Sequence, residues 1–123
     1  MRYLSLVILL LCAACTASPA NVAMVPPLIQ TSGSATIVAT RDSGTTGSDC
    51  FLTVFLDGVT AAKLWTDERT QLKVAPGKHL IEVEESCGGM RTRFDMKIEA
   101  GQTIEYRLLT ALDGSVSVYP AVY

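Results

Sequence analysis

The feature that most restricts the fold is a pair of alternating segments joined by a two-residue turn signal. Residues 78–87 alternate apolar and polar side chains, Gly88-Gly89 follows, and residues 90–98 alternate again. Gly-Gly accepts the positive φ angles of a type I′ turn, which matches the twist of a two-stranded ribbon. A period of two residues indicates β-strands rather than helices. The segment is therefore predicted to be a β-hairpin.

A two-residue turn at Gly88-Gly89 also predicts the register of this hairpin. Counting outward from the turn gives one largely apolar face, on which the opposed pairs are Cys87 with Met90, Val83 with Phe94, Ile81 with Met96 and His79 with Ile98. On the other face the charged side chains, such as Glu84 and Arg93, are expected to pair across the strands and to face solvent.

A second hairpin is predicted around Asp57-Gly58, which separates residues 50–56 from residues 59–65. Asp-Gly is among the strongest short hairpin signals. Both faces of the first segment are apolar, which indicates a central strand that is covered on both sides. A strict count from the turn places Lys63 opposite an apolar residue, so a bulge or an early end is expected in the second strand.

Further short strands are predicted before and after these hairpins. They cover residues 34–41, 70–74, 102–110 and 114–119, with Ile104, Tyr106 and Leu108 on one face. The first and last of these strands are expected to lie exposed at sheet edges, and the Gly-rich loop over residues 42–49 is expected to lie outside the core. Seven or eight short antiparallel strands in about ninety residues favour an all-β sandwich over a barrel or a repeat.

The first fifteen residues have the pattern of an export signal. Arg2 supplies a positive charge, residues 4–11 are almost entirely apolar, and residues 12–15 contain two alanines between two cysteines. This order is typical of a cleaved secretory signal. Polar residues follow too soon for a transmembrane helix, which needs roughly 20 apolar residues. Residues 1–14 are therefore predicted to be a signal peptide.

The end of this signal resembles the lipobox of bacterial lipoproteins, in which two small residues precede a lipidated Cys. Ala13 and Ala14 fit that pattern, and Cys12 stands where the family usually has Leu. The resemblance implies three acyl chains on Cys15, a stable anchor at ~0.8 kcal/mol per buried methylene. It also implies an outer-membrane destination, because Thr16 stands where Asp would favour inner-membrane retention. The alternative is a soluble periplasmic protein in which Cys15 is an unused thiol.

Between this anchor and the body, residues 16–33 carry no charged side chain and contain three prolines. Such composition is typical of a mobile tether, and eighteen residues reach ~60 Å at full extension. The apolar residues 22–29 leave a second interpretation open, in which this segment docks on the domain or lies at the lipid headgroups. The predicted organisation is a signal over 1–14, a lipidated Cys and tether over 15–33, and a sandwich domain over 34–123.

Cys50 and Cys87 remain as an even pair in an oxidising compartment, which favours a disulfide. The predicted register places both sulfurs on the core-facing side of their strands. A bridge that closes a loop of this length stabilises a fold by ~3–4 kcal/mol in the chain-entropy model. The alternative is a redox or metal site, but the pair lacks CxxC spacing and His79 is the one possible imidazole ligand.

Composition argues against catalysis and against nucleic-acid binding. The chain has one histidine, and its neighbouring carboxylates, such as Asp67-Glu68, would point to opposite faces of a strand. His79 is interpreted as a turn or core-edge residue, and no catalytic residue, metal or cofactor is predicted. Signal removal takes away Arg2, which changes the formal charge from −2 to −3. Without a basic cluster, no nucleic-acid partner is expected.

Three motifs resemble PEGA-type domains and small bacterial lipoproteins that carry a domain of unknown function. They are Asp57-Gly58, the run Val74-Ala75-Pro76-Gly77-Lys78-His79 before a strand, and Glu99-Ala100-Gly101-Gln102-Thr103 before the next. Trp65-Thr66-Asp67-Glu68 stands where PEGA domains usually have Gly-x-Thr-Pro. The resemblance implies an Ig-like sandwich that serves as a structural or binding module of the envelope, with no catalytic residue to carry over.

Two functional classes follow. The first is an outer-membrane lipoprotein that faces the periplasm and binds an envelope protein or peptidoglycan through a sheet face or edge, without chemistry. The second binds a small ligand or glycan through Trp65, helped by Tyr106, Tyr119 and Tyr123. A glycan site requires Trp65 exposed in a concave groove with polar neighbours such as Asp67 and Arg69. An interaction module is instead expected to show a flat or edge surface without a pocket of ~300 Å³ or more. The interpretation without a ligand is a half-buried aromatic at a strand end.

Overall fold

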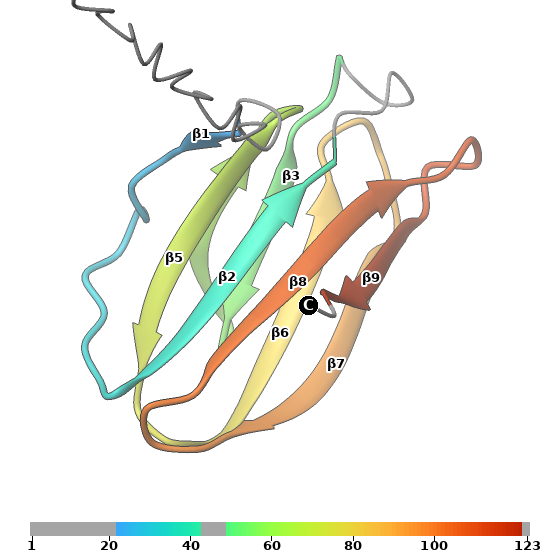
Figure 1. The fold of residues 1–123 in the computed structure, drawn as a ribbon. Helices are drawn as coiled ribbons and strands as arrows, with labels where there is room; N and C mark the ends of the chain where they lie inside the picture. The colour runs from blue at the N-terminus through green and yellow to red at the C-terminus, as the bar shows by residue number, and fades with distance from the viewer. Residues whose placement is uncertain (1–21, 43–48, 122–123) are drawn as a thin grey trace, which may run out of the picture.

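The computed structural model describes residues 22–42 and 49–121. These residues form nine strands and no helix, arranged as two facing sheets (Figure 1). The all-β prediction is confirmed, with nine strands in place of the predicted seven or eight. No part of the described chain is a helix of the length and apolarity that a membrane span requires.

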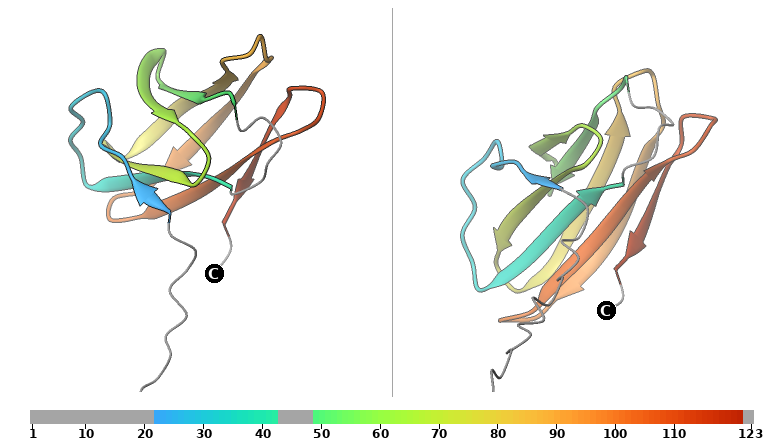
Figure 2. Two further views of the ribbon diagram at one scale, coloured as in Figure 1. Left: turned by 90° about the horizontal axis from the view of Figure 1, so that it is seen from above. Right: turned by 45° about the horizontal axis from the view of Figure 1, so that its top comes forward.

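One sheet has five strands and the other has four, and Figure 2 shows them from above as two layers. The first, in spatial order, contains β1 (Ala23–Met24), β5 (Glu68–Val74), β2 (Ala35–Arg41), β8 (Thr103–Thr110) and β9 (Val116–Pro120). The second contains β4 (Val59–Leu64), β3 (Leu52–Leu56), β6 (Gly77–Glu85) and β7 (Arg91–Ile98). The β1–β5 and β2–β8 pairs are parallel, so the antiparallel prediction is wrong for these two.

The core lies between the sheets because alternate residues of each strand face inward. Its largest fully buried side chains are Ile37, Leu52, Leu64, Leu72, Ile98 and Leu108. Each contributes roughly 1.5–3 kcal/mol when it is removed from water. Ile104 and Tyr106 pack against this core beside Leu108, which confirms their predicted common face.

The β3–β4 hairpin has the predicted turn and the predicted bulge. Asp57 and Gly58 have φ angles of 50° and 83°, as a type I′ turn requires. The register shifts between Val54 and Phe55, and Lys63 consequently pairs with Thr53 on the outer face. The bulge thus removes the mismatch that a strict count from the turn would create.

The β6–β7 hairpin has a longer connection than predicted, and its predicted register is wrong by two residues. Ile81 faces Phe94 and His79 faces Met96, because residues 86–90 form the loop. Ser86 N–H donates to the Phe51 carbonyl, so the start of the loop stays beside β3 and does not pair with β7. An even shift keeps the paired strand residues on their predicted faces. Cys87 and Met90 were predicted to face the core, but they lie exposed in the loop.

The described part of the predicted tether is docked on the sandwich. The N–H groups of Ala23 and Val25 donate to carbonyls of the chain at β5, and Leu28 N–H donates to the Ala61 carbonyl of β4. Val25 and Ile29 also pack against the core. Residues 23–29 therefore lie against the sandwich, in the arrangement that the docked interpretation describes. Cys15 and the signal lie outside the described residues.

The position of β2 also differs from the prediction. It lies between β5 and β8, and six of its seven residues are buried, so it is not an edge strand. Its last two residues are polar and form hydrogen bonds within the domain. Thr40 Oγ1 donates to Glu105, and Arg41 donates to backbone carbonyls. The last predicted strand, β9, does lie at a sheet edge.

Candidate functional site

β9 has one side that is paired with β8 and one side that is open. Ala121 N–H donates to the Glu105 carbonyl of β8. Hydrogen-bonding residues alternate along an antiparallel strand, so the odd-numbered residues of β9 direct their backbone groups toward β8. The other residues, Val116, Val118 and Pro120, direct theirs toward the open side. This edge can therefore pair with a further strand.

The open side presents only a few unbonded backbone groups. The Val116 carbonyl already accepts a hydrogen bond from Thr92 Oγ1 at 2.8 Å, and Pro120 has no N–H. Within the described chain, no hydrogen bond reaches the N–H of Val116, either backbone group of Val118, or the Pro120 carbonyl. The available edge is short and centred on Val118.

An apolar cleft lies beside this edge, between β9 and β7. It measures about 490 Å³, and its apolar lining includes Phe94, Tyr106, Val116, Val118 and Pro120. The rings of Phe94 and Tyr106 pack with centroids 5.0 Å apart, and burial raises the pKa of the Tyr106 phenol. The flat edge without a pocket of ~300 Å³, which was expected of an interaction module, is therefore not found here.

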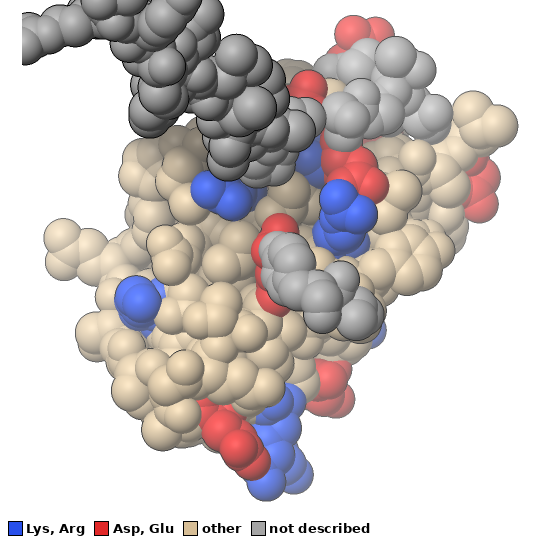
Figure 3. All heavy atoms as spheres, viewed as in Figure 1, with Lys and Arg blue, Asp and Glu red and all other residues tan. Residues whose placement is uncertain are grey.

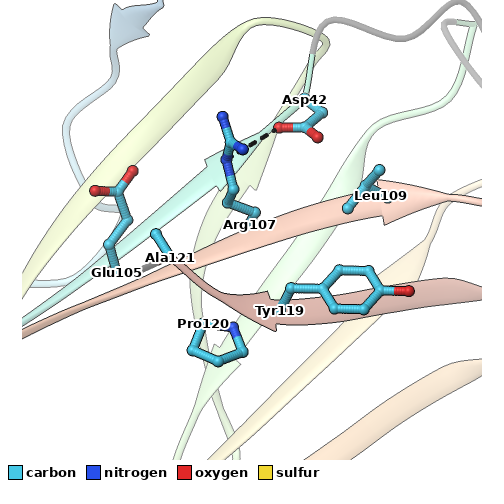
Figure 4. Close-up of a pocket in the computed structure, with 7 residues that line it drawn as sticks. All are labelled: Asp42, Glu105, Arg107, Leu109, Tyr119, Pro120 and Ala121. Atoms are coloured by element: carbon cyan, nitrogen blue, oxygen red, sulfur yellow. Dashed lines mark ion pairs between the residues drawn. The ribbon is translucent and has the colours of Figure 1, made fainter. Parts of the chain in front are cut away.

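A second hollow, more polar and about 550 Å³, lies on the outer face over β8 and β9. Figure 4 shows Arg107 pointing toward Asp42, and their Nε and Oδ1 atoms are 3.7 Å apart. Tyr119 extends along β9 near Leu109, with its hydroxyl directed away from that ion pair (Figure 4). Such an exposed pair adds little stability. Tyr119 thus forms an aromatic side of this hollow, and Asp42 and Arg107 form a charged side.

The face that carries β8 and β9 is mainly uncharged. Figure 3 shows the basic and acidic side chains of this face as small separate groups. A partner that binds near β9 would therefore be held chiefly by backbone hydrogen bonds and apolar contacts.

Trp65 follows β4 and is 46% exposed. Its ring and the Phe51 ring form a T-shaped pair with centroids 5.4 Å apart. Lys63 Nζ lies 5.1 Å from the Phe51 centroid. Phe51, Phe55 and Lys63 line a hollow of about 350 Å³ on the outer face of the four-stranded sheet. Trp65 is not one of the residues that line this hollow, but it packs against Phe51, which is.

The structure does not bring the predicted tyrosines to Trp65. Tyr106 packs inward against Phe94, and Tyr119 lies on β9, at the opposite side of the sandwich from β4. Tyr123 lies outside the described residues. The aromatic neighbour of Trp65 is Phe51, and the alternating pattern of residues 50–56 contained no signal for that contact.

His79 is held by two acceptors. Its Nδ1 lies 2.6 Å from Asp57 Oδ2, and its Nε2 lies 2.6 Å from the Ala75 carbonyl oxygen. A carboxylate and a carbonyl only accept, so both contacts are satisfied when both ring nitrogens are protonated. The hydrogen bonds to Ala75 and Asp57 accordingly raise the pKa of His79. This arrangement locks the β3–β4 turn to β6.

Arg41 and the disulfide hold the opposite end of the sandwich. Arg41 is buried, and its Nη1 donates to the carbonyls of Cys50 and Leu64. Burial lowers the pKa of Arg41, and the charge of Glu85 counteracts part of that effect. The predicted Cys50–Cys87 disulfide is present, with a Cα–Cα distance of 5.7 Å. Cys50 is buried as expected, whereas Cys87 lies in the exposed β6–β7 loop.

One cluster of described residues has the donor types of a metal site. Ligand-type atoms of Cys50, Glu85 and Cys87 lie within 4.8 Å of one another. Both sulfurs belong to the disulfide, and a metal would require thiolates. In the oxidised protein this cluster is therefore a structural link.

No protein-family model matches the chain, and a comparison with curated proteins gives no match.

Proposed function

We propose that this chain is an outer-membrane lipoprotein whose domain binds a partner polypeptide in the cell envelope, without catalysis. The single observation that carries the proposal is the open side of β9, where the Val118 N–H and C=O have no partner within the described chain. Strand addition to such an edge supplies backbone hydrogen bonds, and side chains that enter a neighbouring pocket supply specificity.

The apolar cleft between β7 and β9 supports this function. Alternate side chains of an added strand would face the cleft, because neighbouring strands of a sheet keep their faces aligned. Phe94, Val118 and Pro120 would receive them. An extended segment with apolar residues at alternate positions is therefore the expected class of partner.

The anchor is a separate part of the proposal, and it rests on Ala13, Ala14 and Cys15. Three acyl chains on Cys15 would hold the domain at the membrane. Confinement there raises the effective concentration of partners within reach. A short edge strand with few hydrogen bonds can then be sufficient for binding.

The Ig-like, PEGA-type character of the sandwich is also proposed. Its support is that two of the motifs form one hydrogen-bonded unit, since Asp57 of the Asp-Gly turn accepts from His79 of the Pro-Gly-Lys-His run at 2.6 Å. These two motifs therefore act together in holding the fold, which fits a domain whose motifs are turns.

A photo-crosslinking residue at Tyr119 tests the proposal in cells. Tyr119 is 53% exposed and next to the open edge, so specific polypeptide adducts are expected from this site. The same residue at Leu112, which is 95% exposed in the β8–β9 loop, is the matched control and is expected to give only background. Equal, unspecific labelling from both sites would contradict the proposed function.

Val118→Pro tests whether the adducts depend on hydrogen bonds at the open edge. It removes an N–H that points to the open side and leaves the ladder to β8 intact, so the adducts should disappear while the fold remains. Ser117→Pro removes an N–H of that ladder and should destabilise β9 itself. Substrate turnover that is lost in His79→Ala would overturn the non-enzymatic assignment.

Glycan binding is the second candidate function, and the hollow beside Phe51 favours it. Trp65 is half exposed next to a 350 Å³ hollow that contains Lys63 and Phe55. Titration with a chitin oligosaccharide, followed by Trp fluorescence, tests it. An unchanged Trp65 spectrum at millimolar oligosaccharide would exclude this candidate.

A further inference from the structure

The open side of β9 has a pattern of hydrogen-bonding groups that is complementary to itself. Only Val116, Val118 and Pro120 direct backbone groups outward. Two of their six positions are unavailable: Pro120 lacks an N–H, and the Val116 carbonyl is occupied by Thr92 Oγ1. A strand that pairs here can form no hydrogen bond at the absent Pro120 N–H or at the occupied Val116 carbonyl.

For an antiparallel second copy of β9, one register places these two unavailable positions opposite each other. With Val118 opposite Val118 of the second copy, Val116 lies opposite Pro120. The missing N–H of Pro120 then meets the Val116 carbonyl that Thr92 already satisfies. The remaining Val116 N–H donates to the Pro120 carbonyl, and the two Val118 residues exchange both of their hydrogen bonds.

Registers shifted by two residues leave more backbone hydrogen bonds unmade. Moving the copy so that Val118 faces Pro120 leaves a Val118 carbonyl opposite a residue without an N–H. Moving it so that Val116 faces Val118 directs a Val118 N–H at the carbonyl that Thr92 occupies. An unmade hydrogen bond at a buried position is unfavourable, so the symmetric register is preferred.

Apolar contacts support the same arrangement. Directly opposed residues of an antiparallel pair lie on the same face of the sheet. The second copy would therefore place its Val118 and Pro120 at the mouth of the cleft that contains Phe94 and Tyr106. The two-fold axis would bury the same surface on both copies, as closed dimers require.

We infer that the chain pairs with a second copy of itself through β9, which joins the two five-stranded sheets into one continuous sheet. This inference rests on the proposed function, because it names the polypeptide that occupies the same edge. The contact is short, so membrane confinement is expected to contribute to its stability. The remaining edge of the five-stranded sheet is β1, at the far side from the contact.

Cysteine pairs test the register in membranes of cells that express the full chain. Ser117 and Tyr119 face away from the core, and the inferred register places Ser117 opposite Tyr119 of the second copy. Two differently tagged chains are co-expressed, one with Ser117→Cys and one with Tyr119→Cys. After mild oxidation, we expect a disulfide between the two variants.

The same variants expressed singly are the matched controls. Opposed non-hydrogen-bonded residues have Cα atoms ~4.5 Å apart, and diagonal ones ~7–8 Å apart, whereas disulfides need ~4.4–6.8 Å. The mixture should therefore give at least about tenfold more dimer than either variant alone. Val118→Pro in both chains should reduce the mixture to that background.

The outcomes separate the two proposals. Equal crosslinking in the mixture and in the single variants would overturn the inferred register and show random collision. An uncrosslinked mixture, together with Tyr119 photo-adducts of a different protein, would refute self-pairing and leave strand addition standing. An uncrosslinked mixture with no photo-adducts would refute both.

Discussion

His79 and Asp57 form the best-defined polar contact of the domain, and its position explains a residue choice. Asp57 occupies a left-handed turn position with φ 50° and also accepts from Leu80 N–H at 2.8 Å. Burial by itself would raise the pKa of Asp57, but the hydrogen bonds from His79 and Leu80 outweigh it and lower the pKa. The side chain that forms the turn thus also fixes the strand beside it.

This contact predicts a stability that depends on pH. The raised pKa of His79 gives a contribution that is complete below its unfolded pKa of 6.5 and is lost as pH rises through the folded value. The lowered pKa of Asp57 gives a contribution present above 3.8 and lost as pH falls through its folded value. His79→Gln should therefore cost about 1 kcal/mol between these limits and less in alkali.

Urea denaturation of wild type and His79→Gln at about pH 5 and about pH 9 measures this difference. Lys78→Gln, on the neighbouring exposed position, is the control and should show no such dependence. A cost of His79→Gln that is the same at both pH values would contradict the charged contact.

Arg41 shows why part of the residue-level description was not predictable. The sequence places it at the end of an alternating strand, where a charged side chain normally reaches solvent. Its partners are the carbonyls of Cys50 and Leu64, which the sandwich brings together from two other strands. Backbone acceptors leave no pattern in the sequence, so this buried cation could not be found there.

At the level of elements, turn chemistry and alternation predicted most strands but not their pairing. Asp57-Gly58 gave the correct turn, whereas Gly88-Gly89 gave a register that is wrong by two residues. The difference arises because Ser86 bonds to Phe51 of the neighbouring chain segment. Similarly, β2 lies at the centre because distant strands pair on both its sides, and local sequence does not encode such pairing.

The disulfide belongs to this level, because it ties the β6–β7 loop to Cys50, two residues before β3 begins. Cys50→Ser with Cys87→Ser should destabilise the domain by ~3–4 kcal/mol in the chain-entropy model. Thiol counting on the denatured, unreduced protein should find neither cysteine free. Because Cys87 is exposed, reductant should open the bridge in the folded protein. Two reactive thiols before reduction would contradict the pairing.

At the level of the whole molecule, the sequence predicted a lipid-anchored sandwich, and the structure tests only the sandwich. The docking of residues 23–29 was left open because their apolar side chains suit both a membrane surface and a protein surface. The structure selects the protein surface through the β1–β5 ladder and the packing of Val25 and Ile29.

Lipidation of Cys15 is a prediction for the intact chain. Cells given a radioactive fatty acid should label wild type, and Cys15→Ala should remove the label together with sedimentation in the membrane fraction. Cys12→Ala is the matched control and should keep both. Incorporation that is equal in wild type and Cys15→Ala would refute the anchor.

The β1–β5 ladder would have a mechanical consequence for a chain that is lipidated at Cys15. With residues 23–29 bound to the sandwich, seven residues separate Cys15 from Ala23, and whatever their conformation they span at most about 30 Å. Ala23, where the docked segment begins, would then lie within about 30 Å of the lipidated Cys15. Release of residues 23–29 from β5 and β4 would lengthen this connection. The stability of that whole contact would then affect how far from the membrane the domain can reach.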